Sequence, residues 1–378
     1  MLNCKSDKSF DISKLQNLYQ PNNERIELAK RRQKAVWEGN KPDAWPIIIN
    51  GTLTRDQQEI PAANYKEAFY SDEMMLCAQM RSACASGNSN SDSIPSIRSN
   101  LGTGICLSLL GLSQDVFSDK MPWLREHLTL EQVAKVTPED IVIQGDFERG
   151  LRQMNFFMEV MGDSIPVYCM DTQGPFDIAH LMMGDNIFYL MHDDPSLVHH
   201  IMNIALEIGI KAHRWMKEQS GEPMGENYHD NSLYAENMGI RICEDTSAII
   251  GADDQAEFAL PYTKKLASYF GGAWVHYCGR NDSLTKSILE IEEVRGINFG
   301  HIPGHEHDHP FEEDMENILQ HGKVYYGRWP YRPGEDSKKY LKRIHRWASQ
   351  GALIPCVNMK LDGSLKEIGD VLDFWYSL

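Results

Sequence analysis

Two features that mark large classes of proteins are missing from this sequence. It has no run of the roughly 20 apolar residues that a membrane-spanning helix needs. Basic residues are also scarce, because 37 Lys and Arg stand against 54 Asp and Glu and give a net charge of −17 at pH 7. Proteins that bind nucleic acids or anionic membranes need a basic surface. We therefore predict neither a nucleic-acid partner nor a membrane partner.

Cysteine is sparse as well, with 8 residues in a chain of 378. Small proteins that depend on disulfide bonds have a much higher cysteine density. The opening segment Met1–Lys8 is polar and no apolar core follows it, so it does not resemble a secretory signal. We expect free thiols in a reducing compartment, and hence a soluble cytoplasmic protein.

What the chain does contain is an ordinary globular composition, with 42% hydrophobic and 24% charged residues. Its length fits either two average domains or one α/β barrel with insertions. The order of the predicted strands and helices distinguishes two domains from one barrel.

Short apolar runs alternate with helical patterns along most of the chain. We expect helices over 23–38, which Gly39 would end, and over 197–216, where apolar residues form one stripe. Alternating strands and helices are typical of parallel βαβ units. The predicted strands begin at eight positions: Ile47, Ser96, Pro166, Pro223, Ala273, Gly296, Lys323 and Ala352.

Eight such strands predict an α/β protein that forms a closed (β/α)8 TIM barrel. We expect residues 1–20 to be an N-terminal extension and residues 21–378 to be a single barrel domain, with a long insertion around 53–95. Active sites of these barrels lie where the strands end. Polar residues at strand ends are therefore the best candidates for function.

The strand that starts at Ala273 ends in His276, Tyr277 and Cys278. Alternate residues of a strand face the same side, so His276 and Cys278 can both point to the barrel mouth. A histidine nitrogen and a thiolate are zinc ligands, and Cys356 at the end of the last strand offers a third. Three ligands leave an open position, as in catalytic zinc sites. The alternative is a packed His–Cys pair without metal, because cysteine is often buried without a role.

A second group of candidates follows the predicted sixth strand. Residues 301–309 contain four histidines and two acids, and such a tract either binds a metal or is a solvated loop. His301, at the strand end, is the member that we expect to be catalytic. The roles of His305, His307 and His309 stay open.

Carboxylates and arginines near strand ends form a third group. Glu244 and Asp245 can serve as a general base or a metal ligand, as can the acids around His229 and Asp230. Most of the 54 acids must nevertheless be surface residues. Arg280 and Arg328 can bind an anionic substrate or simply pair with neighbouring acids. The sequence has no phosphate-binding loop, Gly-x-Ser-x-Gly motif or dinucleotide fingerprint.

From about Asn23 to its C-terminus, the sequence resembles the uroporphyrinogen decarboxylase-like superfamily, whose fold is a (β/α)8 barrel. Several residues that lie near strand ends or in the motifs of this resemblance are expected to bind substrate: Asn50, Gln173, Tyr262, Arg280 and Arg328. The motifs that carry the resemblance are Lys41-Pro42-Asp43, Gln173-Gly174-Pro175-Phe176, Asp193-Asp194-Pro195, Glu244-Asp245, Leu260-Pro261-Tyr262 and His276-x-Cys278-Gly279.

Two branches of this superfamily differ at these residues. The decarboxylase branch has an arginine-rich segment after its first strand, to hold the carboxylates of its tetrapyrrole, whereas this chain has the segment 50–55, Asn-Gly-Thr-Leu-Thr-Arg. The methylcobamide:coenzyme M methyltransferase-like branch carries His-x-Cys and a later cysteine as zinc ligands. His276, Cys278 and Cys356 match these ligands in type and order, although Val357 and Asn358 follow Cys356 where that branch usually has a glycine.

The resemblance thus implies a zinc-dependent methyltransferase that moves a methyl group between a corrinoid protein and a thiol or related acceptor. Zinc would be its cofactor, the partner protein would supply the corrinoid, and Glu244, Asp245 and His301 would be catalytic. Two alternatives stay open: a decarboxylase-type lyase that acts on another carboxylated substrate, and a non-catalytic ligand-binding barrel. Both a monomer and a homodimer are compatible with the sequence.

Overall fold

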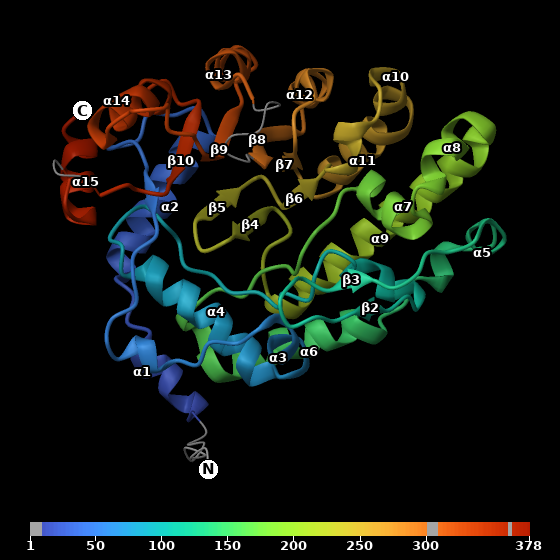
Figure 1. The fold of residues 1–378 in the computed structure, drawn as a ribbon, viewed down its shortest axis with the longest axis horizontal. Coiled ribbons are helices and arrows are strands. Elements are labelled where there is room, and N and C mark those ends of the chain that lie inside the picture. The colour runs from blue at the N-terminus through green and yellow to red at the C-terminus, as the bar shows by residue number, and fades with distance from the viewer. Residues whose placement is uncertain (1–9, 301–308, 362–364) are drawn as a thin grey trace.

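The structure is a computed structural model that describes residues 10–300, 309–361 and 365–378. It is an α/β fold in which helices surround one main parallel sheet (Figure 1). The strands are β1 (Ile48–Ile49), β2 (Gln114–Asp115), β3 (Trp123–Leu124), β4 (Glu226–His229), β5 (Leu233–Glu236), β6 (Ile240–Cys243), β7 (Ala273–Cys278), β8 (Val294–Gly300), β9 (Val324–Arg328) and β10 (Leu353–Val357).

The helices begin largely where the sequence supplies a cap. The Asp194 side chain accepts a hydrogen bond from Leu197 N at the start of α9, which ends at Gly221 in a left-handed conformation. The helices are α1 (Leu15–Leu18), α2 (Asn23–Trp37), α3 (Tyr65–Tyr70), α4 (Asp72–Gly87), α5 (Leu130–Val133), α6 (Gly145–Met161), α7 (Pro175–Met183), α8 (Asn186–Asp193), α9 (Pro195–Ser220), α10 (Ala252–Asp254), α11 (Leu260–Tyr269), α12 (Asp282–Leu289), α13 (Phe311–Gln320), α14 (Ser337–Ala348) and α15 (Ile368–Tyr376).

The main sheet has six strands in the order β1-β10-β9-β8-β7-β6, and all neighbours are parallel. The strands predicted to start at Ile47, Ala273, Gly296, Lys323 and Ala352 correspond to β1, β7, β8, β9 and β10. Because the strands are parallel, their carboxyl ends lie at one edge of the sheet. Side chains near the ends of β6, β7, β9 and β10 therefore come together there.

The strand predicted at Pro223 is wrong as a member of this sheet. Residues Glu226–His229 form β4, which pairs antiparallel with β5 in a separate hairpin. Asp230 and Asn231 both have positive φ angles, of 48° and 54°, and such angles reverse the chain between two strands. The parallel sheet takes β6 instead, which the sequence analysis missed.

The strands predicted at Ser96 and Pro166 are only an isolated parallel bridge between Ile97 and Val167. Serine side chains replace part of the backbone ladder here, because Ser91 Oγ accepts from Ile49 N and donates to Ile49 O. The two segments still bond to the outer strands of the sheet, through Asp92 N to Ile47 O at 2.9 Å and Gly174 N to Cys243 O at 2.7 Å. They lie between β1 and β6 without being strands.

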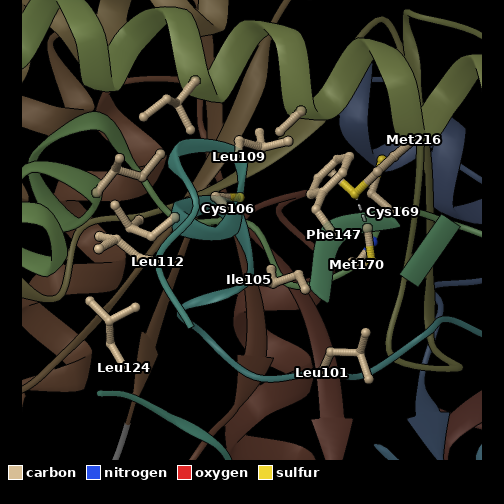
Figure 2. Close-up of a cluster of buried hydrophobic side chains, with 14 of the residues drawn as sticks. Leu101, Ile105, Cys106, Leu109, Leu112, Leu124, Phe147, Cys169, Met170 and Met216 are labelled. Atoms are coloured by element: carbon tan, nitrogen blue, oxygen red, sulfur yellow. Dashed lines mark hydrogen bonds between the residues drawn. The ribbon is translucent and has the colours of Figure 1, made fainter. Parts of the chain in front are cut away.

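The largest hydrophobic core lies under the helices of the first half of the chain. Figure 2 shows part of it, where Leu109, Phe147 and Met216 converge from separate segments. Leu15 of α1 is fully buried in the same core, so part of the predicted extension 1–20 packs onto the domain. In the part of the chain that is described, every helix is too short or too polar to cross a bilayer.

Candidate functional site

The end of β7 brings together two predicted metal ligands. His276 Nε2 lies 3.5 Å from Cys278 Sγ. The sheet register places His276 next to Cys243 of β6 on one side and Asn298 of β8 on the other. The parallel sheet thus places two cysteines and the amide of Asn298 around the imidazole ring of His276.

Asn298 fixes the orientation of the His276 ring. Its side-chain nitrogen donates to the carbonyl of Tyr326, so its oxygen faces His276 Nδ1. The histidine must then carry its proton on Nδ1, and Nε2 presents a lone pair toward Cys278. Burial and the nearby Arg241 lower the pKa of His276 to about 4. The ring is therefore neutral at pH 7, as a metal ligand must be.

Asp245 adds a carboxylate to this site. Its Oδ1 accepts a hydrogen bond from Cys278 N at 2.6 Å and lies 3.8 Å from His276 Nε2. Among the described residues, Cys243, Asp245 and His276 form the one group of three possible metal ligands whose donor atoms all lie within 4.8 Å of one another. Thiolate, imidazole and carboxylate are all ligands of zinc, so the donor set fits that metal.

Cys278 and Cys356 differ in their surroundings. Cys278 is exposed, whereas Cys356 of β10 is half-buried and lines a cavity of about 280 Å³ together with His276. The pKa of each thiol is raised to about 12, mainly because the thiol is buried. At Cys278 the charge of Asp245 also raises the pKa. The structure thus brings His276 and Cys278 into contact and places Cys356 on the wall of the adjoining cavity.

The same cavity is rich in cationic groups. Arg241 and Arg328 line it. The guanidinium of Arg241 pairs with Asp171 at 3.3 Å, and Arg98 approaches the same carboxylate at 3.8 Å. Within the described part of the chain, the guanidinium of Arg328 makes no ion pair or hydrogen bond, so it is available to an anionic group. Asp230, at the tip of the β4–β5 hairpin, faces these cations.

Two buried acids lie behind this edge of the sheet. Glu244 is fully buried and accepts hydrogen bonds from Ser247 and Thr263, while Asp177 accepts from the backbone of Asp245 and Thr246 at 3.1 and 2.7 Å. Burial and the neighbouring acids raise the pKa of Glu244 to about 8 and that of Asp177 to about 7. Glu244 lines neither cavity described in this section, whereas Asp245 reaches the site.

Gln173 and Asp245 line a second cavity, of about 490 Å³, on the α7 side of the sheet edge. Gln173 is only 6% exposed. The two cavities therefore lie on either side of the His276–Asp245 contact. Of the predicted substrate-binding residues, Gln173 and Arg328 line these cavities.

The other predicted residues lie elsewhere. Tyr262 is buried, with its hydroxyl 3.0 Å from His199 Nδ1, and Arg280 pairs with Asp282 at 2.8 Å. Asn50 is exposed after β1. None of the three lines either cavity.

The histidine tract falls largely outside the described residues, since His301, His305 and His307 belong to the stretch 301–308. His309 is described and is a packing residue. Its ring stacks on Phe299 with centroids 3.7 Å apart, and its Nε2 lies 2.7 Å from the carbonyl of Gly279.

Sequence reasoning missed Cys243, Arg241, Asp171 and Asp177. The first two were detectable, because Arg241 and Cys243 alternate with Ile240 and Ile242 in the pattern of a strand with two different faces. Asp171 directly follows the strand predicted from Pro166, so its position was a signal, whereas Asp177 had none. Their roles depend on partners about 70 residues away in the sequence.

No family model and no curated protein matches this sequence. Among solved structures, the chain is similar to a methyltransferase from Methanosarcina mazei, with a TM-score of 0.62 and 16% sequence identity over 92% of this chain and 98% of that chain. At this identity the similarity establishes a shared fold.

Proposed function

We propose that this chain is a zinc-dependent methyltransferase that moves a methyl group between a corrinoid protein and a thiol or related acceptor. The observation that carries the proposal is the contact between His276 and Cys278, with the Asp245 carboxylate beside it, at the carboxyl end of β7. The neighbour with the same fold is named a methyltransferase. We further propose that the six strands and the segments around Ile97 and Val167 together form a (β/α)8 barrel.

His276 and Cys278 would hold the zinc, and Cys356 would be the third ligand. Asp245 or Cys243 lies close enough to His276 to complete the set. When bound, zinc supplies a Lewis acid that lowers the pKa of a substrate thiol and keeps it as a thiolate. Asn298 holds the His276 ring with Nε2 toward the ligands.

Arg328 orients the substrate in this proposal. Its guanidinium lies at the end of β9 on the cavity wall, where it can bind a negatively charged group of the thiol substrate. The thiolate held in this cavity would be the nucleophile, and a corrinoid carried by the partner protein would supply the methyl group. In such a transfer a sulfur–carbon bond would form as the methyl group leaves the corrinoid, which would keep the electron pair of the broken bond.

Zinc content of the purified protein tests the metal site. We expect about one zinc per chain in the wild type and a loss of most of it in Cys278→Ala and Cys356→Ala, because a missing ligand weakens binding strongly. Cys84→Ala is the matched control, since Cys84 is a buried cysteine of α4. The proposal would be contradicted by wild-type protein without zinc, or by equal zinc content in Cys278→Ala and Cys84→Ala.

Activity is tested separately with methylcobalamin and 2-mercaptoethanol, by following the absorbance change on demethylation. The zinc-loaded wild type should accelerate the reaction. The rate with Cys278→Ala should be at least about a hundredfold lower than the rate with the wild type. An equal rate with Cys278→Ala would show that the transfer, if any, does not use this site. Zinc binding without any acceleration would favour the ligand-binding barrel.

A further inference from the structure

The 490 Å³ cavity beside Asp245 is not used by the proposed function. Its walls come from β3, from α7 with the loop that follows it, and from the segment after β6. Figure 1 shows β3 and α7 on the same side of the molecule, beyond β6. The volume lies in the range of small-molecule sites in proteins, about 300–1,000 Å³.

The charged side chains of this cavity are of one sign. Asp185 and Asp245 line it as carboxylates, together with the buried Asp177, whose pKa burial raises to about 7. In the described part of the chain the lining also includes His127 and His180 but no lysine or arginine. The partly exposed His180 lies between Asp185 and Thr246, at 3.3 and 3.2 Å. Carboxylates gathered around a cavity without a lysine or arginine attract a cation.

Gln173 gives a second, independent indication of a ligand. The residue is 6% exposed and lines the cavity. Among the described residues its side-chain amide has no hydrogen-bond partner, and the residue forms part of the cavity wall. Buried amides are nearly always hydrogen-bonded. A ligand in the cavity would supply the partner that this amide lacks.

The lining of this cavity suits an organic cation better than a metal ion. The three carboxyl groups do not form a group with oxygens within 4.8 Å of one another, as a metal ion would require. Trp123, at the cavity wall, is 59% exposed and presents an indole ring, the aromatic group that binds cations best. The volume also far exceeds that of a single ion.

We propose that this cavity binds a small organic ammonium compound about the size of choline. The ammonium group would lie between the acids and the indole of Trp123, and the amide of Gln173 would hydrogen-bond a polar group of the ligand. The assignment does not depend on methyl transfer. Because Asp245 also contacts Cys278 N, the bound cation would lie next to the proposed metal ligands.

Calorimetry on the full-length chain tests the proposal with choline chloride and with 3,3-dimethylbutan-1-ol, a neutral compound of the same shape. We expect choline to bind at least about tenfold more tightly than the alcohol, because only choline carries the charge. Trp123→Ala and Asp185→Asn should each weaken choline binding by about tenfold.

Matched controls lie on α8, where Tyr189 is 71% exposed and Asp193 is exposed. Neither residue lines the cavity. Tyr189→Ala and Asp193→Asn remove the same kinds of groups and should leave choline binding unchanged. Both test positions, Trp123 and Asp185, are largely exposed, so their variants should fold.

Three results would overturn the inference: equal binding of choline and the alcohol, equal effects of the test and control variants, or displacement of choline by MgCl2, which would indicate an inorganic ion site. Cys278→Ala separates this inference from the proposed function. That variant should lose zinc and still bind choline, so either property can fail while the other holds.

Discussion

Glu244 is fully buried, and burial together with the nearby charge of Asp177 raises its pKa from 4.5 to about 8. The folded protein therefore binds a proton at pH values where the unfolded chain has released it. The stability that this proton contributes is fully present below about pH 4.5. It falls as the pH rises toward 8 and changes no further above that value.

This effect predicts the behaviour of Glu244→Gln, which cannot titrate. The free energy of unfolding of the wild type should fall relative to that of the variant between pH 5 and pH 8, by an amount on the order of a few kcal/mol. Urea unfolding at several pH values measures the difference. Glu148→Gln, at an exposed position of α6, is the control. A difference that does not change with pH would contradict the prediction.

At the same scale, the sequence predicted the pair His276 and Cys278 because both lie on one strand, where the period of two decides which side chains share a face. It named Asp245 among its candidate metal ligands, but it did not predict Cys243. Cys243 and Asp245 reach His276 from a different strand, and Cys356 lies in the adjoining cavity. Those positions depend on the register between strands, which short patterns do not contain.

Among the elements, the β4–β5 hairpin carries His229 and Asp230 to the cavity. A fully buried ion pair anchors its base: Lys217 Nζ lies 2.8 Å from Glu222 Oε2 and also donates to the carbonyls of Pro223 and Glu226. Glu222 in turn accepts from Tyr228 N at 3.0 Å. The pair connects the end of α9 to the first strand of the hairpin.

Glu222→Gln should destabilise the protein by about 3 kcal/mol, because it leaves the charge of Lys217 buried without its counter-ion. The midpoint of urea unfolding measures this loss. Glu131→Gln breaks the exposed Lys135–Glu131 pair, whose separation of 2.7 Å is close to that of the buried pair, and should change stability by less than about 0.5 kcal/mol. Equal effects of the two variants would show that the hairpin does not depend on its buried anchor.

The hairpin also shows why the sequence pattern predicted the wrong strand at Pro223. Residues 223–226 have the apolar and glycine content of a short strand, but Asp230 and Asn231 turn the chain back without any glycine. In β6, Arg241 interrupts the apolar run because its guanidinium pairs with the buried Asp171. The charge of Arg241 breaks the continuous apolar run, so only the alternation of Arg241 and Cys243 with Ile240 and Ile242 indicates this strand in the sequence.

For the molecule as a whole, the sequence predicted the α/β class and the parallel arrangement of β1 and β7–β10, since long alternation of strands and helices leaves few other topologies. Regular strands were also predicted near Ile97 and Val167, but the structure has only an isolated bridge between these residues. The hydroxyl of Ser91, which precedes Ile97 in the chain, bonds to both backbone groups of Ile49, so this segment is attached to β1 without a regular ladder.

If zinc binds the folded chain as proposed, it must stabilise the whole molecule. At a free zinc concentration about a hundredfold above Kd, the gain is about 2.7 kcal/mol, which should raise the thermal midpoint by several degrees. Differential scanning fluorimetry with and without zinc measures the shift. Cys278→Ala should show almost none, whereas Cys84→Ala should shift like the wild type. Equal shifts in all three proteins would place zinc elsewhere.

The tip of the β4–β5 hairpin is held by residues from far earlier in the chain. Asn231 Oδ1 accepts from Ser96 N, 135 positions away, and the carbonyl of Asn231 accepts from Ser86 Oγ, 145 positions away. Contacts between such distant segments form only after a long loop has closed, which is slow compared with local helix formation. We therefore expect the helices to form early and the cavity lined by His276 to reach its final shape late in folding.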